Sequence, residues 1–360
     1  MRKFLIAAGA RPNFIKIAPL IHELRRDDNG VAWKLIHTGQ HYDYEMSEAF
    51  FDEFDLPKPD YFLNVGPGSH AEQTARIMIE FEKICLEERP DVVIVVGDVN
   101  STLACSLTAK KLNIKVAHIE AGLRSGDMAM AEEINRIATD SISDYLFVTE
   151  KSGIANLRRE GKREEQIIFT GNIMIDTLYY CLKKLETLSV EKIADPPYAV
   201  LTLHRPSNVD NKFKLEDILR AMVEISRDIP LYFPVHPRTK GNMEKFHLNN
   251  LLENTNISVL PPLPYLAFLS LWKDAALVLT DSGGIQEETT ALGVACFTIR
   301  DNTERPITVE EGTNLLIGTT GGKILRAYDD FKRGLQKASR IPDLWDGRTA
   351  KRIVDRLLVG

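Results

Sequence analysis

The fold is decided by residues 92–98, where the chain has the sequence VVIVVGD. Five β-branched residues in succession are typical of a strand in a parallel sheet that is covered by helices on both faces. Pro90 comes just before the run, and Gly97 and Asp98 end it with residues that favour a turn. The stretch therefore predicts a buried strand with a carboxylate directly after its carboxyl end.

Apolar runs of the same kind recur along the chain and alternate with segments of helical periodicity. One of these helices begins after Ser69, where Ser69 and Glu72 have the spacing of a capping box, and it extends towards Pro90. Regular alternation of strands and helices predicts a doubly wound α/β fold. The expected strands span residues 3–8, 32–37, 92–96, 115–119, 145–148, 198–204, 231–235, 258–261, 277–280 and 296–299.

A proline pair at Pro196 and Pro197 marks the expected boundary between two α/β halves of similar size. We expect an N-terminal Rossmann-type domain over residues 1–194 and a C-terminal Rossmann-type domain over residues 195–347. Residues 348–360 are expected to form a C-terminal helix, a candidate to pack back on the first domain. Two facing domains of this type leave a cleft where the carboxyl ends of both sheets meet, and ligands bind there.

The composition of the 360-residue chain is that of an ordinary globular protein, with 44% hydrophobic and 27% charged residues. The net charge of −6 argues against nucleic-acid binding, and no apolar run approaches the ~20 residues of a membrane span. Four widely spaced cysteines in apolar contexts predict reduced thiols and a cytoplasmic location. Neither GxGxxG nor GxxxxGKS/T occurs, and no spacing of potential ligands predicts a metal site.

The first strand is followed by Gly9-Ala10-Arg11-Pro12, a turn that opens a helix containing Lys16. The glycine permits a close approach of the backbone, while Arg11 and the helix N-terminus are suited to bind phosphate. A tight strand-to-helix turn with a solvated arginine is the structural alternative. The spacing alone leaves both interpretations open.

Carboxylates follow several predicted elements of the first half. Asp98 follows the strand at 92–96, Glu120 ends the next strand, and Glu132 opens a helix beside Glu133. Each has a structural alternative, because Asp98 can cap a helix and Glu132 can interact with a helix dipole. Glu120 is the hardest to explain in this way, since a carboxylate that closes an apolar strand is costly to bury without a partner. Together they predict acid/base chemistry at one edge of the sheet.

The second half carries the sequence DSGGIQEE at residues 281–288, directly after a predicted strand. Gly283 and Gly284 expose backbone N–H groups at a helix N-terminus. We favour an anion-binding cradle over a glycine-containing N-cap, because Glu288 one turn later is well placed to accept from ribose hydroxyls.

Three histidines lie in or directly after predicted strands. His204 and His236 follow two strands of the second half, and His204 beside Arg205 is a candidate ligand for a leaving phosphate. His118 lies inside a strand, and we interpret it as a core histidine because a lone histidine is usually structural.

Ten short motifs occur in a fixed order, and together they resemble the non-hydrolysing UDP-N-acetylglucosamine 2-epimerases over nearly the whole chain. Each motif is weak alone, but ten in order are specific. The resemblance implies a GT-B-like fold of two Rossmann-type domains, a UDP-sugar substrate, a homodimer, a role in polysaccharide biosynthesis, and no metal or nicotinamide cofactor. The motifs are GARP at 9–12 with Lys16, GQH at 39–41, GD at 97–98, HIEAGLR at 118–124, EEINR at 132–136, GN at 171–172, HR at 204–205, HP at 236–237, DSGGIQEE at 281–288 and TERP at 303–306.

The implied reaction is the reversible 2-epimerisation of UDP-N-acetylglucosamine to UDP-N-acetylmannosamine. The hydrogen at C2 is not acidic because no carbonyl is adjacent, and oxidation of a neighbouring carbon would need the missing nicotinamide site. The remaining route expels UDP from C1 while a base removes the C2 proton, and UDP then re-adds to 2-acetamidoglucal. This route needs carboxylates around the sugar and cationic or N–H groups at the departing diphosphate.

The resemblance assigns a role to individual residues of this chain. Asp98, Glu120 and Glu132 match the acid/base carboxylates, and His204 completes the predicted catalytic set. Glu288 matches the ribose contact, while the face of the sugar that each carboxylate serves stays open. The residues that match the diphosphate contacts are Arg11, His204, Ser282, Gly283 and Gly284, with Arg300 and Arg305 in the same shell. The predicted substrate-binding set also contains Lys16, Arg136 and His236.

The chain departs from the family pattern at several positions. Ala131 stands where a proline often precedes the glutamate pair, and Asn13 stands where glutamate is frequent. After the His-Arg pair this chain has Pro-Ser-Asn at 206–208, where the family often has Arg-Glu-Asn. Residues 40–41 match part of a regulatory nucleotide-sugar site of bacterial members, but Glu72 stands where that site has a basic residue. These departures leave the sugar and its regulation open.

Four alternative functions stay open for this chain. One is a 2-epimerase of a modified UDP-amino sugar of the 2,3-diacetamido type, and another is a hydrolysing enzyme that releases the free sugar. A glycosyltransferase would share the fold but would not need three clustered carboxylates. A sugar-nucleotide sensor would bind without turnover.

Overall fold

In the computed structural model the chain divides into two compact units. Unit 1 consists of Met1–Tyr180 with Asp343–Gly360, and unit 2 is Cys181–Pro342. The division falls inside the helix α7 (Ile173–Thr187), upstream of the boundary expected at Pro196. The helix continues across the division and its composition does not change there, so the sequence gives no sign of it. The residues that the structure describes are 2–26, 30–39, 50–188, 193–335 and 337–359.

Unit 1 is built on a seven-stranded parallel sheet with the order β3-β2-β1-β4-β5-β6-β7. The run that decides the fold forms β4, whose five residues are all buried between β1 and β5. This order reverses between β1 and β4, as in doubly wound sheets, and the reversal opens a crevice at the carboxyl ends of these strands. The strands are β1 (Lys3–Ala8), β2 (Ala32–His37), β3 (Tyr61–Phe62), β4 (Val92–Val96), β5 (Lys115–Ala121), β6 (Tyr145–Val148) and β7 (Ile167–Phe169).

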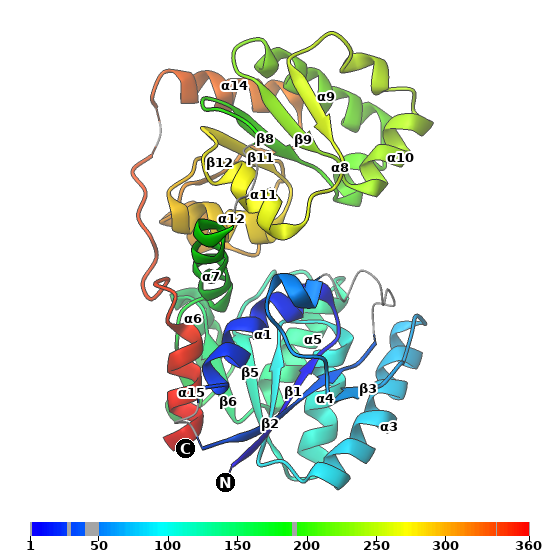
Figure 1. Cartoon of the computed structure of the whole chain (residues 1–360), viewed down its shortest axis with the longest axis vertical. Coiled ribbons are helices and arrows are strands. Elements are labelled where there is room, and N and C mark those ends of the chain that lie inside the picture. The colour runs from blue at the N-terminus through cyan, green and yellow to red at the C-terminus, as the bar shows by residue number, and fades with distance from the viewer. Residues whose placement is uncertain (1, 27–29, 40–49, 189–192, 336, 360) are drawn as a thin grey trace. The chain divides into compact units, whose positions relative to one another are not determined.

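Helices cover both faces of this sheet (Figure 1). On one side α3, α4 and α5 pack next to one another, and α1 packs against α15. The capping box predicted at the start of α3 is confirmed, since the Ser69 hydroxyl accepts from the Glu72 N–H and the Glu72 carboxylate accepts from the Ser69 N–H. The helices are α1 (Arg11–Leu24), α3 (His70–Glu88), α4 (Asn100–Lys111), α5 (Ala131–Ile142), α6 (Lys151–Arg159), α7 and α15 (Thr349–Val359), with the 3-10 turn η1 (Glu164–Gln166).

The end of the chain returns to unit 1 as α15, so both termini lie in this unit (Figure 1). The Asp176 carboxylate on α7 accepts from the N–H groups of Thr349 and Ala350, at 3.1 and 2.7 Å, and so caps α15 from a distance. Burial raises the pKa of Asp176 to about 6, although these N–H donors oppose the shift. Gly171 admits the returning chain, because a Cβ there would lie 2.1 Å from the Leu344 carbonyl oxygen.

Unit 2 repeats the topology with a six-stranded parallel sheet of order β10-β9-β8-β11-β12-β13. The predicted doubly wound α/β class is therefore confirmed for both halves. Its strands are β8 (Ala199–Thr202), β9 (Leu231–Pro234), β10 (Ile257–Leu260), β11 (Leu277–Thr280), β12 (Cys296–Thr298) and β13 (Asn314–Leu316). Its helices are α8 (Pro206–Val209), α9 (Lys212–Ser226), α10 (Pro237–Lys245), α11 (Tyr265–Trp272), α12 (Gly283–Leu292), α13 (Pro306–Glu310) and α14 (Gly321–Lys332), with the 3-10 turn η2 (Asn249–Leu251).

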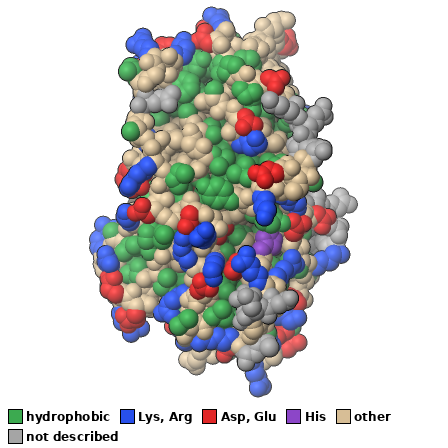
Figure 2. Space-filling view, turned by 60° about the vertical axis from the view of Figure 1, so that its left-hand side comes forward, with side chains coloured by type: hydrophobic (Ala, Val, Ile, Leu, Met, Phe, Trp, Pro, Cys, Tyr) green, Lys and Arg blue, Asp and Glu red, His purple; other side chains and the backbone are tan. Residues whose placement is uncertain are grey.

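The surface and the cysteines have ordinary features. Figure 2 shows acidic and basic side chains interspersed over the displayed face. No helix in the described part of the chain combines the length and the apolar character that a membrane crossing requires. The four cysteines are buried free thiols.

Candidate functional site

The predicted site residues of unit 1 gather at the carboxyl ends of β1, β4 and β5. The start of α1 is fixed there by Asn13, whose side-chain oxygen accepts from the Ala10 N–H at 3.1 Å and whose amide donates to the Val96 carbonyl at 3.0 Å. Arg11, in the first turn, is exposed, with its guanidinium 5.0 Å from the centre of the Phe50 ring. The turn after β1 is therefore held against β4, and it leaves Arg11 accessible to a ligand.

Glu120 lies near the end of β5 in a left-handed backbone conformation, with φ of 71°. A positive φ is uncommon for a residue other than glycine and is found at strained functional positions. The register of β5 on β6 also shifts here, between Ile119 and Ala121. The Glu120 side chain is 3% exposed and forms an ion pair with Lys16 of α1. Glu120 and Lys16, which were predicted separately as a catalytic and a substrate-binding residue, thus meet across two elements.

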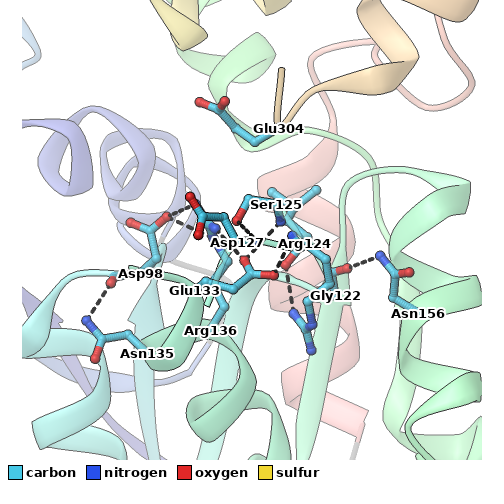
Figure 3. A network of polar contacts seen from close by, with 12 residues as sticks. Asp98, Gly122, Arg124, Ser125, Asp127, Glu133, Asn135, Arg136, Asn156 and Glu304 are labelled. Atoms are coloured by element: carbon cyan, nitrogen blue, oxygen red, sulfur yellow. Dashed lines mark hydrogen bonds and ion pairs between the residues drawn. The ribbon is translucent and has the colours of Figure 1, made fainter. Parts of the chain in front are cut away.

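Asp98 follows β4 and is held by Arg136 of α5. The Nη2 and Nε atoms of Arg136 lie 2.6 and 3.0 Å from Oδ2 of Asp98, and the Asn135 amide donates to the Asp98 backbone carbonyl at 2.8 Å (Figure 3). The Asp98 side chain is 29% exposed, so one carboxylate is oriented by an arginine while it stays open to solvent. Arg136, predicted to bind substrate, contacts the acid/base candidate Asp98 in this structure.

The adjacent glutamates of α5 differ in environment. Glu133 is buried and accepts from the N–H groups of Ser125 and Gly126, both at 2.9 Å, and from Arg136 at 2.8 Å (Figure 3). Burial alone would raise the pKa of Glu133, but these donors outweigh it and lower the pKa. Glu132, the predicted catalytic residue, is exposed in the first turn and makes no hydrogen bond or ion pair within the described residues. Glu133 therefore anchors the loop, and Glu132 is accessible to a ligand.

His118 is fully buried and connects the turns that follow β4 and β5, next to Asp98 and Glu120. Its Nδ1 lies 2.7 Å from Oδ1 of Asp140, and its Nε2 lies 2.9 Å from the Gly97 carbonyl oxygen. The other Asp140 oxygen accepts from the Gly122 N–H at 3.0 Å. Burial would raise the pKa of Asp140, but His118 and Arg124 lower it. The interpretation of His118 as a core histidine is consistent with these contacts, which connect the turns after β4 and β5.

In unit 2, Asp281 organises the carboxyl ends of β8 and β11. Its carboxylate accepts from the backbone N–H groups of His204 and Arg205 at 3.1 and 2.9 Å, and from the Asn208 amide at 3.2 Å. The Nδ1 atom of His204 lies 2.8 Å from Oδ1 of Asp281. Burial would raise the pKa of Asp281, but His204 and these backbone donors lower it. The His204 side chain is 41% exposed, so Asp281 orients an imidazole whose other side can reach a ligand.

His236 lies beside His204, with 5.7 Å between the ring centroids. It is the N-cap of α10, where Nδ1 accepts from the Arg238 N–H at 3.2 Å. Burial, followed by the nearby His204, lowers the pKa of His236. In this structure His236, which was predicted to bind substrate, therefore caps a helix at the edge of the same site.

The predicted cradle is the N-terminus of α12, with Ser282 as its N-cap and Gly283 and Gly284 as its first two residues. The Ser282 N–H already donates to the Thr280 hydroxyl at 2.9 Å. The predicted ribose ligand, Glu288, is buried on this helix and accepts from the Tyr265 hydroxyl at 2.6 Å. Burial raises the pKa of Glu288 to about 8, and the neighbouring Glu287 adds to the shift.

The predicted arginines join a set of ion pairs beside this helix. Arg300 Nη2 lies 2.8 Å from Oε2 of Glu304, and Arg205 Nη2 lies 3.3 Å from Oε1 of the same carboxylate. Arg305 Nε lies 2.9 Å from Oε1 of Glu287. Arginines therefore gather at the carboxyl edge of unit 2, as carboxylates do in unit 1.

The sequence did not predict several residues at the two strand edges. These are the residues that hold the predicted site side chains in place. Asp281 and Glu304 stood in quoted motifs without a role. Asp140 and Tyr265 had no local signal, because their partners His118 and Glu288 are distant in sequence. The predicted regulatory segment at residues 40–41 lies outside the described residues.

Comparison with known proteins gives consistent matches. The model of a family described as UDP-N-acetylglucosamine 2-epimerase matches residues 22–358. A Methanocaldococcus jannaschii protein named UDP-N-acetylglucosamine 2-epimerase is 44% identical, over 99% of this chain and 99% of that protein. A Pseudomonas aeruginosa protein named UDP-2,3-diacetamido-2,3-dideoxy-D-glucuronate 2-epimerase is 39% identical, over 95% of this chain and 98% of that protein.

Solved structures agree with these matches. The M. jannaschii UDP-GlcNAc 2-epimerase, in complex with UDP-GlcNAc and UDP, superposes with a TM-score of 0.87 at 44% identity over 100% of both chains. The Neisseria meningitidis UDP-GlcNAc 2-epimerase bound to UDP-GlcNAc gives a TM-score of 0.88 at 31% identity, over 99% of this chain and 100% of that chain. The similarity in both cases extends over both units of this chain.

Proposed function

The chain belongs to the UDP-N-acetylglucosamine 2-epimerase family, and from this we propose that it interconverts UDP-N-acetylglucosamine and UDP-N-acetylmannosamine by eliminating and re-adding UDP. The observation that carries the proposal is the pair of carboxylates Asp98 and Glu120 at neighbouring strand ends, each held by a cationic side chain. The elimination requires acid/base groups at the sugar, and these carboxylates are of the right chemical type.

The proposed reaction proceeds in two steps, an elimination and an addition. A carboxylate takes the C2 proton, the C2–H electron pair forms the C1–C2 double bond, and the C1–O bond breaks with its electrons leaving on UDP. In the second step UDP oxygen adds to C1 of the 2-acetamidoglucal, and C2 takes a proton on the opposite face. We propose Asp98, Glu120 and Glu132 as the groups that carry these protons.

Lys16 and Arg136 are the cationic partners of the two carboxylates. Lys16 forms an ion pair with Glu120, and Arg136 forms one with Asp98, so each carboxylate is held in place by a cationic side chain. Arg11 is exposed at the same strand edge and is proposed to bind the diphosphate. Removal of a proton from the sugar needs a base in a fixed position, and these ion pairs fix the positions of two candidates.

Unit 2 supplies the proposed diphosphate site. His204 is oriented by Asp281, and Arg300, Arg305 and the N-terminus of α12 add positive potential where charge develops on leaving UDP. Glu288 is proposed to bind the ribose hydroxyls. These groups stabilise negative charge and transfer no proton from the sugar.

The second candidate substrate is a UDP-2,3-diacetamido sugar acid. The observation that favours it is the 39% identity to the P. aeruginosa enzyme named for that substrate, which covers nearly all of both chains. The 44% identity to the M. jannaschii enzyme favours UDP-N-acetylglucosamine. Turnover of both substrates under the same conditions separates the two candidates.

Proton NMR in deuterated water tests the reaction. The purified protein is incubated with UDP-N-acetylglucosamine, and we expect UDP-N-acetylmannosamine to form with deuterium incorporated at C2 of both epimers. UDP and free N-acetylmannosamine as the only products would indicate a hydrolase. Tight UDP binding without C2 exchange would indicate a sensor, and either result contradicts the proposal.

The remaining parts of the proposal concern the assembly, location and cofactors. We propose a homodimer in the cytoplasm that acts in polysaccharide biosynthesis, with no metal or nicotinamide in the reaction. Light scattering coupled to gel filtration measures the mass of the assembly. Full turnover after treatment with a chelator, with no nucleotide cofactor added, is the result expected for the chemistry above.

A further inference from the structure

The Glu304 carboxylate lies at the N-terminus of α12, in the place where the cradle was expected to hold a ligand. A Cβ built on Gly283, the first residue of α12, would lie 2.9 Å from Oε1 of Glu304. The same oxygen lies 3.3 Å from Arg205 Nη2, and Oε2 lies 2.8 Å from Arg300 Nη2. Glycine at position 283 is what leaves room for this carboxylate so close to the helix.

The surroundings of Glu304 are those that an anion receives at a binding site. Its side chain is 16% exposed, and burial alone would raise its pKa, but Arg300 and Arg305 hold the pKa at about 2. The positive end of the α12 dipole acts in the same direction. Glu304 is therefore fixed as an anion in a pocket of positive potential.

Arg300 retains hydrogen-bonding capacity beyond its contact with Glu304. The Arg300 side chain is 10% exposed, and its Nη1 atom is buried with no hydrogen-bond partner within the described residues. A buried guanidinium nitrogen without an acceptor is costly, and a second acceptor group would satisfy it. A diphosphate presents more acceptor oxygens than one carboxylate, so this geometry points to a larger anion than Glu304.

We propose that Glu304 is an internal stand-in for the diphosphate, filling the phosphate site of unit 2 when no ligand is bound and leaving it when UDP or a UDP-sugar enters. The proposal rests on the UDP-sugar function proposed above, and it adds a regulation of affinity at that site. The carboxylate and the diphosphate are both negative and cannot share one set of donors without repulsion. The ligand must therefore displace Glu304, and this competition weakens binding.

A rival role for Glu304 gives the opposite result. If Glu304 served only to position Arg300 and Arg205, its loss would let these guanidinium groups move and would weaken UDP binding. If Glu304 competes with the ligand, its loss strengthens binding, because the arginines stay positive and the negative charge that competes with the phosphate is gone. The sign of the change in affinity therefore separates the two roles.

The experiment measures dissociation constants by calorimetry for UDP, inorganic pyrophosphate and uridine with the wild-type protein, Glu304→Gln and Glu304→Ala. Gln keeps the size of the side chain and a neutral acceptor for Arg300, and Ala removes both. We expect UDP and pyrophosphate to bind about tenfold more tightly to both variants, which corresponds to about 1.4 kcal/mol, while the affinity for uridine stays the same. Glu216→Gln is the matched control, since Glu216 pairs with Arg220 on the exposed face of α9.

Unchanged or weaker binding of UDP and pyrophosphate to folded Glu304→Gln and Glu304→Ala would overturn the proposal. A gain in affinity for uridine as large as that for UDP would also overturn it, since the competition concerns phosphate groups alone. Failure of the wild-type protein to bind UDP would contradict the proposed function instead. In that case the pyrophosphate comparison still tests the role of Glu304.

Discussion

The two units share one strand order around their switch points, β1/β4 and β8/β11, but they place opposite charges there. In unit 1, carboxylates are oriented by single cations, as in Asp98 with Arg136. In unit 2, arginines pair with carboxylates, as in Arg305 with Glu287. The fold supplies the same edge twice, and the side chains after each strand decide its chemistry. One edge is suited to proton transfer and the other to an anion.

The buried carboxylates at both edges are paired with groups of their own unit. An ion removed from water is costly unless a partner and further hydrogen bonds compensate it. Glu120 meets this requirement through Lys16, and Asp281 through His204 and the neighbouring backbone N–H groups. We therefore expect that removing a carboxylate from the strand edge of unit 1 affects proton transfer, whereas removing a cationic group from the strand edge of unit 2 affects binding of the phosphate.

The largest effect is expected for Glu120→Gln. Loss of a general acid or base typically lowers the rate 10²–10⁴-fold, so we expect turnover to fall by about that factor while UDP affinity stays nearly unchanged. Asp98→Asn is expected to behave in the same way. The measurements are C2 exchange from each epimer and the dissociation constant for UDP.

Glu80→Gln is a matched control for this test, because Glu80 pairs with Lys83 on the exposed face of α3. If folded Glu120→Gln turns over at nearly the wild-type rate, Glu120 is not catalytic. A fall in UDP affinity as large as the fall in turnover would contradict the assignment of proton transfer to unit 1 and of phosphate binding to unit 2.

The next effect is expected for His204→Ala. Removal of one donor that stabilises developing charge costs about 2.7–4 kcal/mol, or about 10²–10³ in rate. In contrast to Glu120→Gln, we expect UDP affinity to fall along with turnover, because the imidazole is proposed to contact the phosphate. Steady-state kinetics and UDP calorimetry on the same preparation show both effects. An unchanged UDP affinity in this variant would remove His204 from the phosphate site.

Asp176→Ala tests a stability difference between the units. The variant leaves the N–H groups of Thr349 and Ala350 without their buried acceptor, which typically costs about 1–3 kcal/mol. We expect chemical denaturation to show this loss for unit 1, while unit 2 unfolds as before. Asp355→Ala, which removes an exposed partner of Lys351 on α15, is the control expected to change little. Equal stability of Asp176→Ala and wild type would show that the cap contributes nothing.

The smallest change per measured interval is the pH dependence due to Glu288, which is spread over several pH units. Burial raises its pKa to about 8 in the folded protein, from a usual value of 4.5. Between these pH values the folded state keeps a proton that the unfolded state has lost, so the free energy of unfolding falls as pH rises. The slope is at most about 1.4 kcal/mol per pH unit for one proton. Denaturation of wild type and Glu288→Gln from pH 5 to pH 9 should show this slope only in the wild type, and parallel curves would contradict it.

The fold could be predicted because most strands are buried and apolar. Residues 92–96 and 277–280 show this best, since their predicted and observed limits coincide. The unpredicted strands are β3, β7 and β13, which have two or three residues and lie at sheet edges. Such strands are defined by hydrogen bonds to a neighbour, and a short sequence carries little signal for that pairing.

The site could be predicted only in part. The residues that follow strands were found, because strand ends are where this fold binds ligands. The residues that orient them were not, since Asp140 and Asp281 act through partners that lie far away in sequence or through backbone N–H groups. No role was predicted for Glu304, because its position at the α12 N-terminus is visible only in the three-dimensional structure.

The return of α15 to unit 1 has a consequence for synthesis on the ribosome. Unit 1 begins with the first strand, but its α1 packs on α15, whose Ile353, Val354 and Leu357 are buried. Residues 181–342 must emerge between these two parts, which takes on the order of 10–30 s at typical elongation rates. Unit 2 is one continuous segment, so it can finish folding while the face of α1 that packs on α15 is still uncovered. The half of the protein that is made first is therefore the half that is completed last.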